Sequence, residues 1–121
     1  MSLARSIKIN TNDADVHEQL LRIVTRISSI LPNSVIRAFG SLARGELTVE
    51  SDLDISVIVP DDIDTQELRK KIRTGCILSH PWPLDLIFFN VSHYENRSKI
   101  GGVCFDIAEE GIELYPVWKL Q

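Results

Sequence analysis

The sequence predicts an α/β (α+β) fold, a small mixed β-sheet flanked by helices, and three observations lead to this class. Short apolar runs rich in β-branched residues alternate with longer segments whose apolar residues recur at helical spacing. Proline, glycine or acidic turn residues stand at most of the boundaries between them. The chain has 121 residues, 44% of them hydrophobic and 25% charged, so residues 1–121 are expected to form one domain.

Each predicted element follows from such a pattern and its boundary residue. Apolar residues at i, i+3 and i+4 make the first segment an amphipathic helix, and Pro32 ends it. Asp64 with Glu67 indicates a helix start, as does the capping-box pair Ser92 and Glu95. The predicted elements are a helix over 13–31, a strand over 35–39, a turn of helix over 42–46, a strand over 54–59, a helix over 65–75, a strand over 84–89, a helix from 92 to 111 weakened early by the glycines at 101–102, and a strand over 112–115. The short connection between the first two strands favours an antiparallel pairing.

Charge and hydropathy exclude several functions. The net charge is −4 and no cluster of Lys or Arg is present, so a long nucleic acid is not expected as a ligand. No apolar run approaches the ~20 residues of a membrane span, and no signal peptide is recognised. Cys76 and Cys104 are widely spaced and define neither a disulfide framework nor a zinc site. We therefore expect a cytoplasmic protein with two free, buried thiols.

Three aspartates are the candidates for chemistry. Asp52 and Asp54 are two residues apart, so on a strand they share one face at a separation of roughly 6.6 Å. Asp85 opens another predicted strand, and pairing of the two strands would bring all three carboxylates together. Unit charges about 6 Å apart repel by about 3 kcal/mol at an effective dielectric constant near 20. A single aspartate is usually a cap or a solvated carboxylate. Three aspartates that open apolar strands instead predict a bound counter-cation, and oxygen ligands favour Mg²⁺ or Mn²⁺.

Gly40 and Ser41 would supply a phosphate site beside these carboxylates. A glycine at a strand end lets the backbone approach a ligand closely, and the start of a following helix presents free N–H groups to an anion. The Ser41 hydroxyl adds a further donor. A Gly-Ser pair alone is an ordinary turn, and its position ten residues before Asp52 is what favours a functional role.

These spaced motifs resemble those of the DNA polymerase β-like nucleotidyltransferase superfamily, and more closely the minimal nucleotidyltransferase (MNT) proteins. The stretch 40–46 is similar to their phosphate-binding turn, and 51–54 is similar to their metal motif. Residues 84–86 resemble the strand of their third carboxylate, and 110–115 resemble their usual ending. The resemblance covers roughly residues 16–115 and implies the polymerase β-like palm fold.

The resemblance implies transfer of a nucleoside monophosphate, usually AMP from ATP, with two Mg²⁺ or Mn²⁺ ions. Carried onto this sequence, Asp52 and Asp54 would hold both metal ions. Asp85 would ligate the catalytic ion and assist deprotonation of an acceptor hydroxyl. Gly40 and Ser41 would hold the triphosphate of the nucleotide.

Two further residues are candidates for nucleotide binding, each with a structural alternative. Arg44 could reach the triphosphate or could pair with Glu46 or Glu50. Ser51 could orient a phosphate or the Asp52 carboxylate, or could simply close a local turn.

The acceptor is the open part of the prediction. MNT proteins of this length resemble antitoxins that adenylylate a tyrosine of a separate HEPN-type toxin, and this partner is our leading hypothesis. One alternative is a small-molecule acceptor such as an aminoglycoside, bound in a cleft completed by a homodimer. Another is a catalytically silent module that only binds a partner, and the presence of all three aspartates argues against it.

Overall fold

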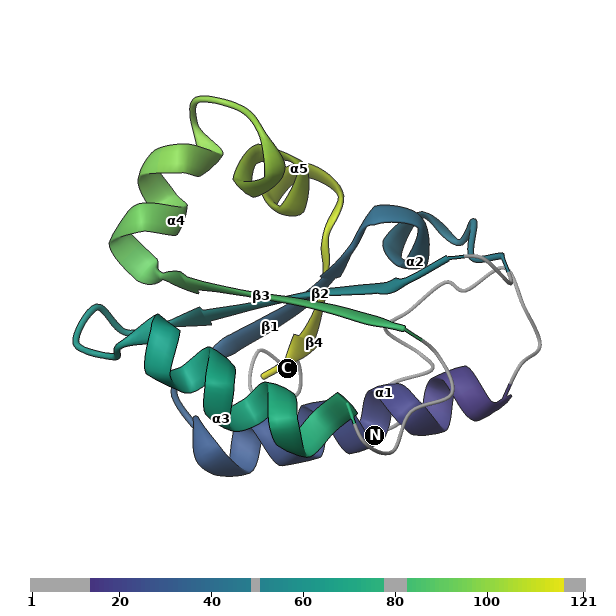
Figure 1. Ribbon diagram of the computed structural model, residues 1–121. Helices are drawn as coiled ribbons and strands as arrows, with labels where there is room; N and C mark the ends of the chain where they lie inside the picture. The colour runs from purple at the N-terminus through teal and green to yellow at the C-terminus, as the bar shows by residue number, and fades with distance from the viewer. Residues whose placement is uncertain (1–13, 49–50, 78–82, 117–121) are drawn as a thin grey trace.

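A four-stranded mixed sheet forms the centre of the structure (Figure 1). The structure is a computed structural model and describes residues 14–48, 51–77 and 83–116. Its spatial order is β3 (Leu84–Asn90), β2 (Leu53–Val59), β1 (Val35–Phe39) and β4 (Ile112–Tyr115). The strand β1 runs antiparallel to both β2 and β4, whereas β2 and β3 are parallel. The predicted mixed sheet and the antiparallel pairing of the first two strands are confirmed.

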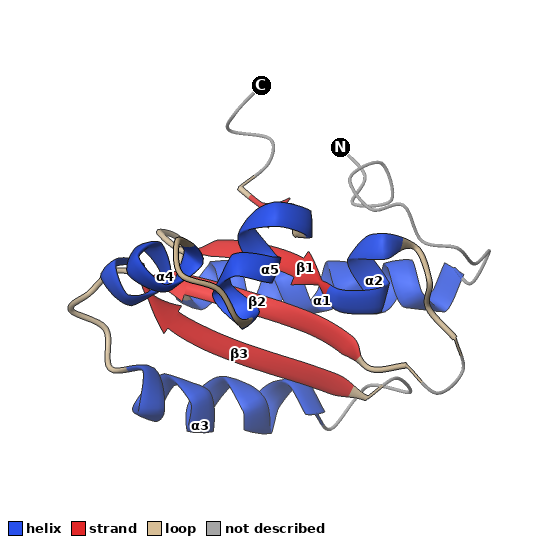
Figure 2. Cartoon of the chain, turned by 90° about the horizontal axis from the view of Figure 1, so that it is seen from above, coloured by secondary structure: helices blue, strands red, loops and turns tan. Residues whose placement is uncertain are grey.

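Helices cover both faces of this sheet (Figures 1 and 2). The long helices α1 (Ala14–Ile30) and α3 (Thr65–Ile77) lie on one face. The shorter helices α2 (Gly40–Arg44), α4 (Val91–Ser98) and α5 (Val103–Glu110) lie on the other. None of the helices in the described part of the chain is long and apolar enough to cross a membrane.

The alternation of side chains along β2 separates the core from the functional face. Leu53, Ile55, Val57 and Val59 are fully buried and belong to one apolar cluster with residues of α1 and α3. Side chains alternate between the two faces of a strand, so Asp54 and its even-numbered neighbours point to the face that carries α2, α4 and α5. The apolar face therefore holds β2 in place, and on the other face Asp54 is the one residue of β2 that is partly exposed.

The segment 92–111 differs from its prediction, because two helices replace the single helix expected there. Gly101 and Gly102 adopt φ angles of 139° and 79°, a region that continues no right-handed helix, and α4 and α5 lie on either side of them. The capping-box prediction at Ser92 is also wrong. Asn90 is the N-cap residue of α4, and the backbone N–H of Ser92 donates to Asp61 Oδ1 at 3.0 Å instead.

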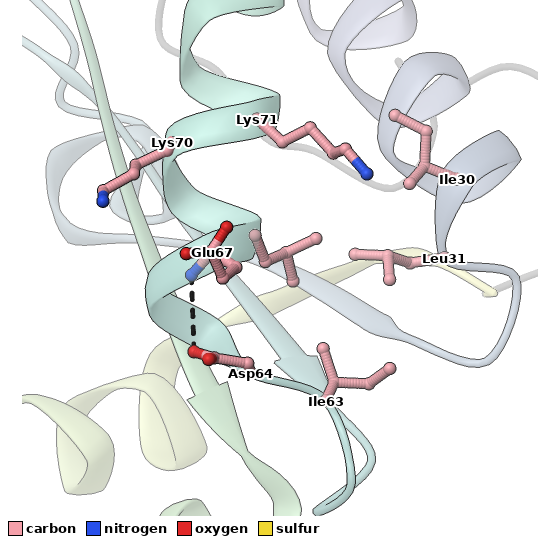
Figure 3. Close-up of a pocket in the computed structure, with 8 residues that line it drawn as sticks. Ile30, Leu31, Ile63, Asp64, Glu67, Lys70 and Lys71 are labelled. Carbon is pink, nitrogen blue, oxygen red and sulfur yellow. Dashed lines mark hydrogen bonds between the residues drawn. The ribbon is translucent and has the colours of Figure 1, made fainter.

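Two further predictions concern the cysteines and the start of α3. Cys104 is a free, buried thiol as expected, and the Cys76 side chain lies outside the described residues. Asp64 caps α3 as predicted: its Oδ1 accepts the backbone N–H groups of Gln66 at 3.0 Å and of Glu67 at 3.3 Å. Figure 3 shows the second of these bonds.

Replacing Asp64 by alanine should lower the free energy of unfolding by about 1 kcal/mol, the usual contribution of an N-cap side chain. Urea denaturation followed by circular dichroism measures this change. Asp62→Ala is the matched control, because Asp62 is exposed and makes no hydrogen bond or ion pair with any residue that the structure describes. Equal stabilities of the two variants would contradict the assignment of the cap.

Candidate active site

Parallel pairing of β2 with β3 places Asp54 directly beside Asp85. The two residues are Cα partners in the register of the two strands. Asp52 lies just before the first residue of β2 and is exposed, as is Asp85, whereas Asp54 is half-buried. The sheet thus brings the predicted pair Asp54 and Asp85 together, and Asp52 approaches them from the start of the strand.

Asp54 is the carboxylate whose ionisation is most strongly affected by this arrangement. The pKa of Asp54 is raised from 3.8 to about 6, chiefly by burial, and also by the negative charges of Asp85 and Asp52 and by a hydrogen bond to Asp85. The positive charge of Arg44 acts in the opposite sense and lowers it. The two negative neighbours therefore act on Asp54 as the sequence analysis expected, and positive charge near this point is favourable.

Gly40 provides the space that the Asp54 side chain occupies. It is the first residue of α2, directly after β1, and has a φ angle of 65°. A Cβ atom built at this position would lie 2.3 Å from Asp54 Oδ2, closer than any real contact. Both the backbone conformation and the contact thus favour glycine, which lets the turn that opens α2 lie against the Asp54 carboxylate.

The start of α2 presents backbone N–H groups at the same place. The first N–H groups of a helix have no partner within the helix, and the N-cap residue Phe39 offers no side-chain hydrogen bond to them. Ser41, partly exposed, is the next residue of this turn. Gly40 and Ser41 therefore combine close backbone approach with donors that suit phosphate oxygens.

Arg44 and Ser51 are both engaged with neighbouring side chains in the structure. Arg44 Nε donates to Glu46 Oε1 at 2.8 Å, the structural alternative that the sequence analysis named, and Nη1 donates to Glu110 Oε1 at 3.0 Å. Ser51 Oγ accepts the backbone N–H of Thr48 at 2.9 Å, which closes a local turn before Asp52. Glu50 lies outside the described residues.

The carboxylates have the donor chemistry of a divalent-cation site. Oxygen ligands suit Mg²⁺ and Mn²⁺, and the raised pKa of Asp54 shows that a cation at this point would remove an electrostatic cost. In residues 14–48, 51–77 and 83–116, no three His, Cys, Asp or Glu side chains are gathered as metal ligands. Asp54 and Asp85 already lie together and share a hydrogen bond, so the residues fit a divalent ion by their chemistry.

A hollow of about 550 Å³ lies away from these aspartates (Figure 3). It is formed by the end of α1, the loop after β2 and the first turns of α3, on the opposite face of the sheet. Its lining residues are Ile30, Leu31, Ile63, Asp64, Glu67, Leu68, Lys70 and Lys71. Because Asp54 lies at the other end of β2, this hollow is separate from the candidate active site.

The sequence matches the nucleotidyltransferase domain family over residues 18–114, which include every residue of the site. The chain belongs to this nucleotidyltransferase domain family. The predicted enzyme class is thereby confirmed. In this nucleotidyltransferase, the Gly-Ser turn and the three aspartates lie at one end of the sheet. No curated protein matches the chain significantly.

The chain is similar to solved structures at low sequence identity. A Sulfolobus solfataricus protein, provisionally described as a nucleotidyltransferase, is 17% identical, with a TM-score of 0.52 over 85% of this chain and 87% of its own. A toxin–antitoxin structure with AMP-PNP is 20% identical, with a TM-score of 0.49 over 81% of this chain and 71% of its own. A mutant of the toxin–antitoxin pair MntA–HpeT is 18% identical, with a TM-score of 0.47 over the same two shares.

Sequence reasoning missed the role of Glu110 at this site. Its carboxylate binds Arg44 across a separation of 66 residues in the chain. Glu110 opens the stretch 110–115 that resembles the ending of MNT proteins, but no periodicity or spacing relates it to Arg44. Only the packing of α5 beside α2 brings the two together.

Gly40→Ala should reduce nucleotidyl transfer by roughly 100-fold, the size of loss expected when a reacting group moves by about 1 Å. The added Cβ would collide with Asp54 Oδ2 and displace it or the turn. Steady-state rates of the purified variants measure the effect, and Gly102→Ala is the control, because that glycine also has a positive φ but nothing lies within 4 Å of its Cβ position. If both variants lost the same amount of activity, backbone strain alone would account for the defect.

Proposed function

We propose that this protein transfers a nucleoside monophosphate, AMP from ATP, to a hydroxyl group of a partner protein. The observation that carries the proposal is the contact of Asp54 with Asp85 on one side and with the Gly40 turn on the other, in a chain of the nucleotidyltransferase domain family. The carboxylates and the backbone N–H groups of the Gly40 turn lie within one small region, which supports binding of a triphosphate there.

Each site residue has a role in this proposal. Asp52 and Asp54 would hold two Mg²⁺ or Mn²⁺ ions, and Asp85 would ligate one of them. When bound, such ions stabilise the attacking and leaving oxygens of a phosphoryl displacement. Gly40, through its backbone, and Ser41, through its hydroxyl and its N–H, would hold the triphosphate.

Two residues beside the site support nucleotide binding in this proposal. Arg44 would bind the triphosphate through its guanidinium, a group suited to bidentate contact with phosphate. Ser51 would contribute by closing the turn with Thr48 that leads into Asp52.

The proposed reaction needs a base next to the acceptor. The acceptor oxygen attacks the α-phosphorus, its proton passes to the Asp85 carboxylate, and the bond between the α-phosphorus and the bridging oxygen breaks to release pyrophosphate. Asp85 is exposed and lies beside Asp54, so it can meet an incoming hydroxyl and a bound nucleotide at once.

The exposure of the site favours a protein as the acceptor. Asp52 and Asp85 are both exposed at the end of the sheet, where a tyrosine on another protein can approach. Together with the resemblance to MNT antitoxins, this supports adenylylation of a HEPN-type toxin in the cytoplasm. The antitoxin would then act by modifying its toxin.

The test is incubation of the protein with α-labelled ATP, Mg²⁺ and a HEPN-type protein encoded beside it. Wild type should label a tyrosine of that protein, and Asp54→Asn should label it roughly 10²- to 10³-fold more slowly, as expected for loss of one preorganised charge at a reacting centre. Asp62→Asn, which changes an exposed aspartate in the loop after β2, should label at the wild-type rate.

Other results would overturn parts of the proposal. Equal rates for Asp54→Asn and wild type would remove Asp54 from the active site. If the label appeared only on a small molecule of a cell extract, the acceptor would be that small molecule and not a protein. A wild-type protein that neither binds nor transfers nucleotide would refute the enzymatic proposal.

A further inference from the structure

The guanidinium group of Arg44 lies between two carboxylates at the edge of the active site. Arg44 is the last residue of α2, and its Nε and Nη1 atoms donate to Glu46 and to Glu110 at 2.8 and 3.0 Å. The Arg44 side chain is 43% exposed, and the Glu46 and Glu110 side chains are 64% and 40% exposed. Both ion pairs therefore form in contact with water.

The same guanidinium group is close to the proposed triphosphate site. Arg44 follows Ser41 by three residues on α2, a spacing that places two side chains on the same side of a helix. In the structure its hydrogen bonds are made to Glu46 and Glu110. A triphosphate bound beside Ser41 would therefore meet the guanidinium group that Glu46 and Glu110 hold.

Both carboxylates are attached to backbone that the fold holds in place. Glu46 lies in the turn that ends α2, where its backbone N–H donates to Ser41 O at 2.9 Å. Glu110 ends α5, and the following Gly111 donates its N–H to Ile107 O at 2.9 Å. Arg37 Nη2 in turn donates to Gly111 O at 3.0 Å, which ties this junction to β1. The two acceptors thus stand ready for Arg44 whether or not a nucleotide is present.

We propose that Glu46 and Glu110 compete with the triphosphate of the nucleotide for Arg44. The inference rests on the proposed function, in which Arg44 is a triphosphate ligand. In the nucleotide-free protein the two carboxylates neutralise the guanidinium group. On binding, phosphate oxygens take their place, and Glu46 and Glu110 turn to water.

The weakness of exposed ion pairs makes this exchange possible. A pair of this exposure changes an equilibrium by a small factor, because water competes for both partners. Removing the Glu110 carboxylate should therefore raise the affinity for a triphosphate roughly two- to five-fold. Glu46 and Glu110 lower the affinity for the nucleotide because they bind Arg44 when no nucleotide is present. They make no contact with the nucleotide themselves.

Calorimetric titration with a non-hydrolysable ATP analogue and Mg²⁺ tests this, using Glu110→Gln against Glu109→Gln. Glu109 is the matched control, because it precedes Glu110, is exposed and makes no ion pair with a residue in the described ranges. Each substitution removes one negative charge, so the net charge of the protein changes equally in both. Glu110→Gln should bind the analogue two- to five-fold more tightly than Glu109→Gln, and the two should bind AMP, which lacks the outer phosphates, alike.

The same titrations in an Arg44→Gln background complete the test. There the advantage of Glu110→Gln over Glu109→Gln should disappear, since no guanidinium remains to be released. An affinity of Glu110→Gln equal to or below that of Glu109→Gln would overturn the inference and would make Glu110 a residue that positions α2. Failure of the wild-type protein to bind the analogue at all would instead refute the proposed function.

Discussion

The parallel pairing of β2 with β3 sets Asp54 beside Asp85, and the rest of the site depends on that contact. Two carboxylates at adjacent positions of neighbouring strands repel each other, and burial of Asp54 adds to the cost. The surrounding groups reduce this cost: Gly40 leaves room for the Asp54 side chain, and Arg44 supplies positive charge near it. A nucleotide with its cations would complete the compensation, which explains why a fold retains the contact.

The raised pKa of Asp54 also has a consequence for stability. The pKa is about 6 in the folded protein and 3.8 in the reference state, so between these pH values the folded protein binds a proton that the unfolded chain releases. The cost of keeping Asp54 charged, from burial first and from repulsion second, therefore lowers the stability of the fold in full above pH 6 and is relieved as the pH falls toward 4. The apolar core formed by α1, α3 and the buried face of β2 stabilises the fold and offsets the cost of this carboxylate. A strongly shifted pKa of this kind is typical of functional residues.

Much of this organisation could be predicted from the sequence, because it depends on local patterns. Helical spacing, β-branched runs and the Asp64 cap located the elements, and the spacing of the Gly-Ser turn from the aspartates indicated the site. Long-range packing decided the rest. Nothing local relates Arg44 to Glu110, and the capping pattern at Ser92 was misleading because Asp61, from the loop after β2, binds that residue instead. The break at Gly101 and Gly102 was underestimated, because helical periodicity continues across it.

The pKa of the Asp54 carboxyl group, followed by carbon-13 NMR with and without Mg²⁺, tests the central claim most directly. In the absence of Mg²⁺ the carboxyl group should titrate near 6, well above the ordinary 3.8 of an aspartate. Saturation with Mg²⁺ and a non-hydrolysable nucleotide should lower the value by at least about one pH unit, because a bound cation favours the charged carboxylate. A pKa near 3.8 in the free protein, or one that Mg²⁺ and nucleotide leave unchanged, would contradict the account.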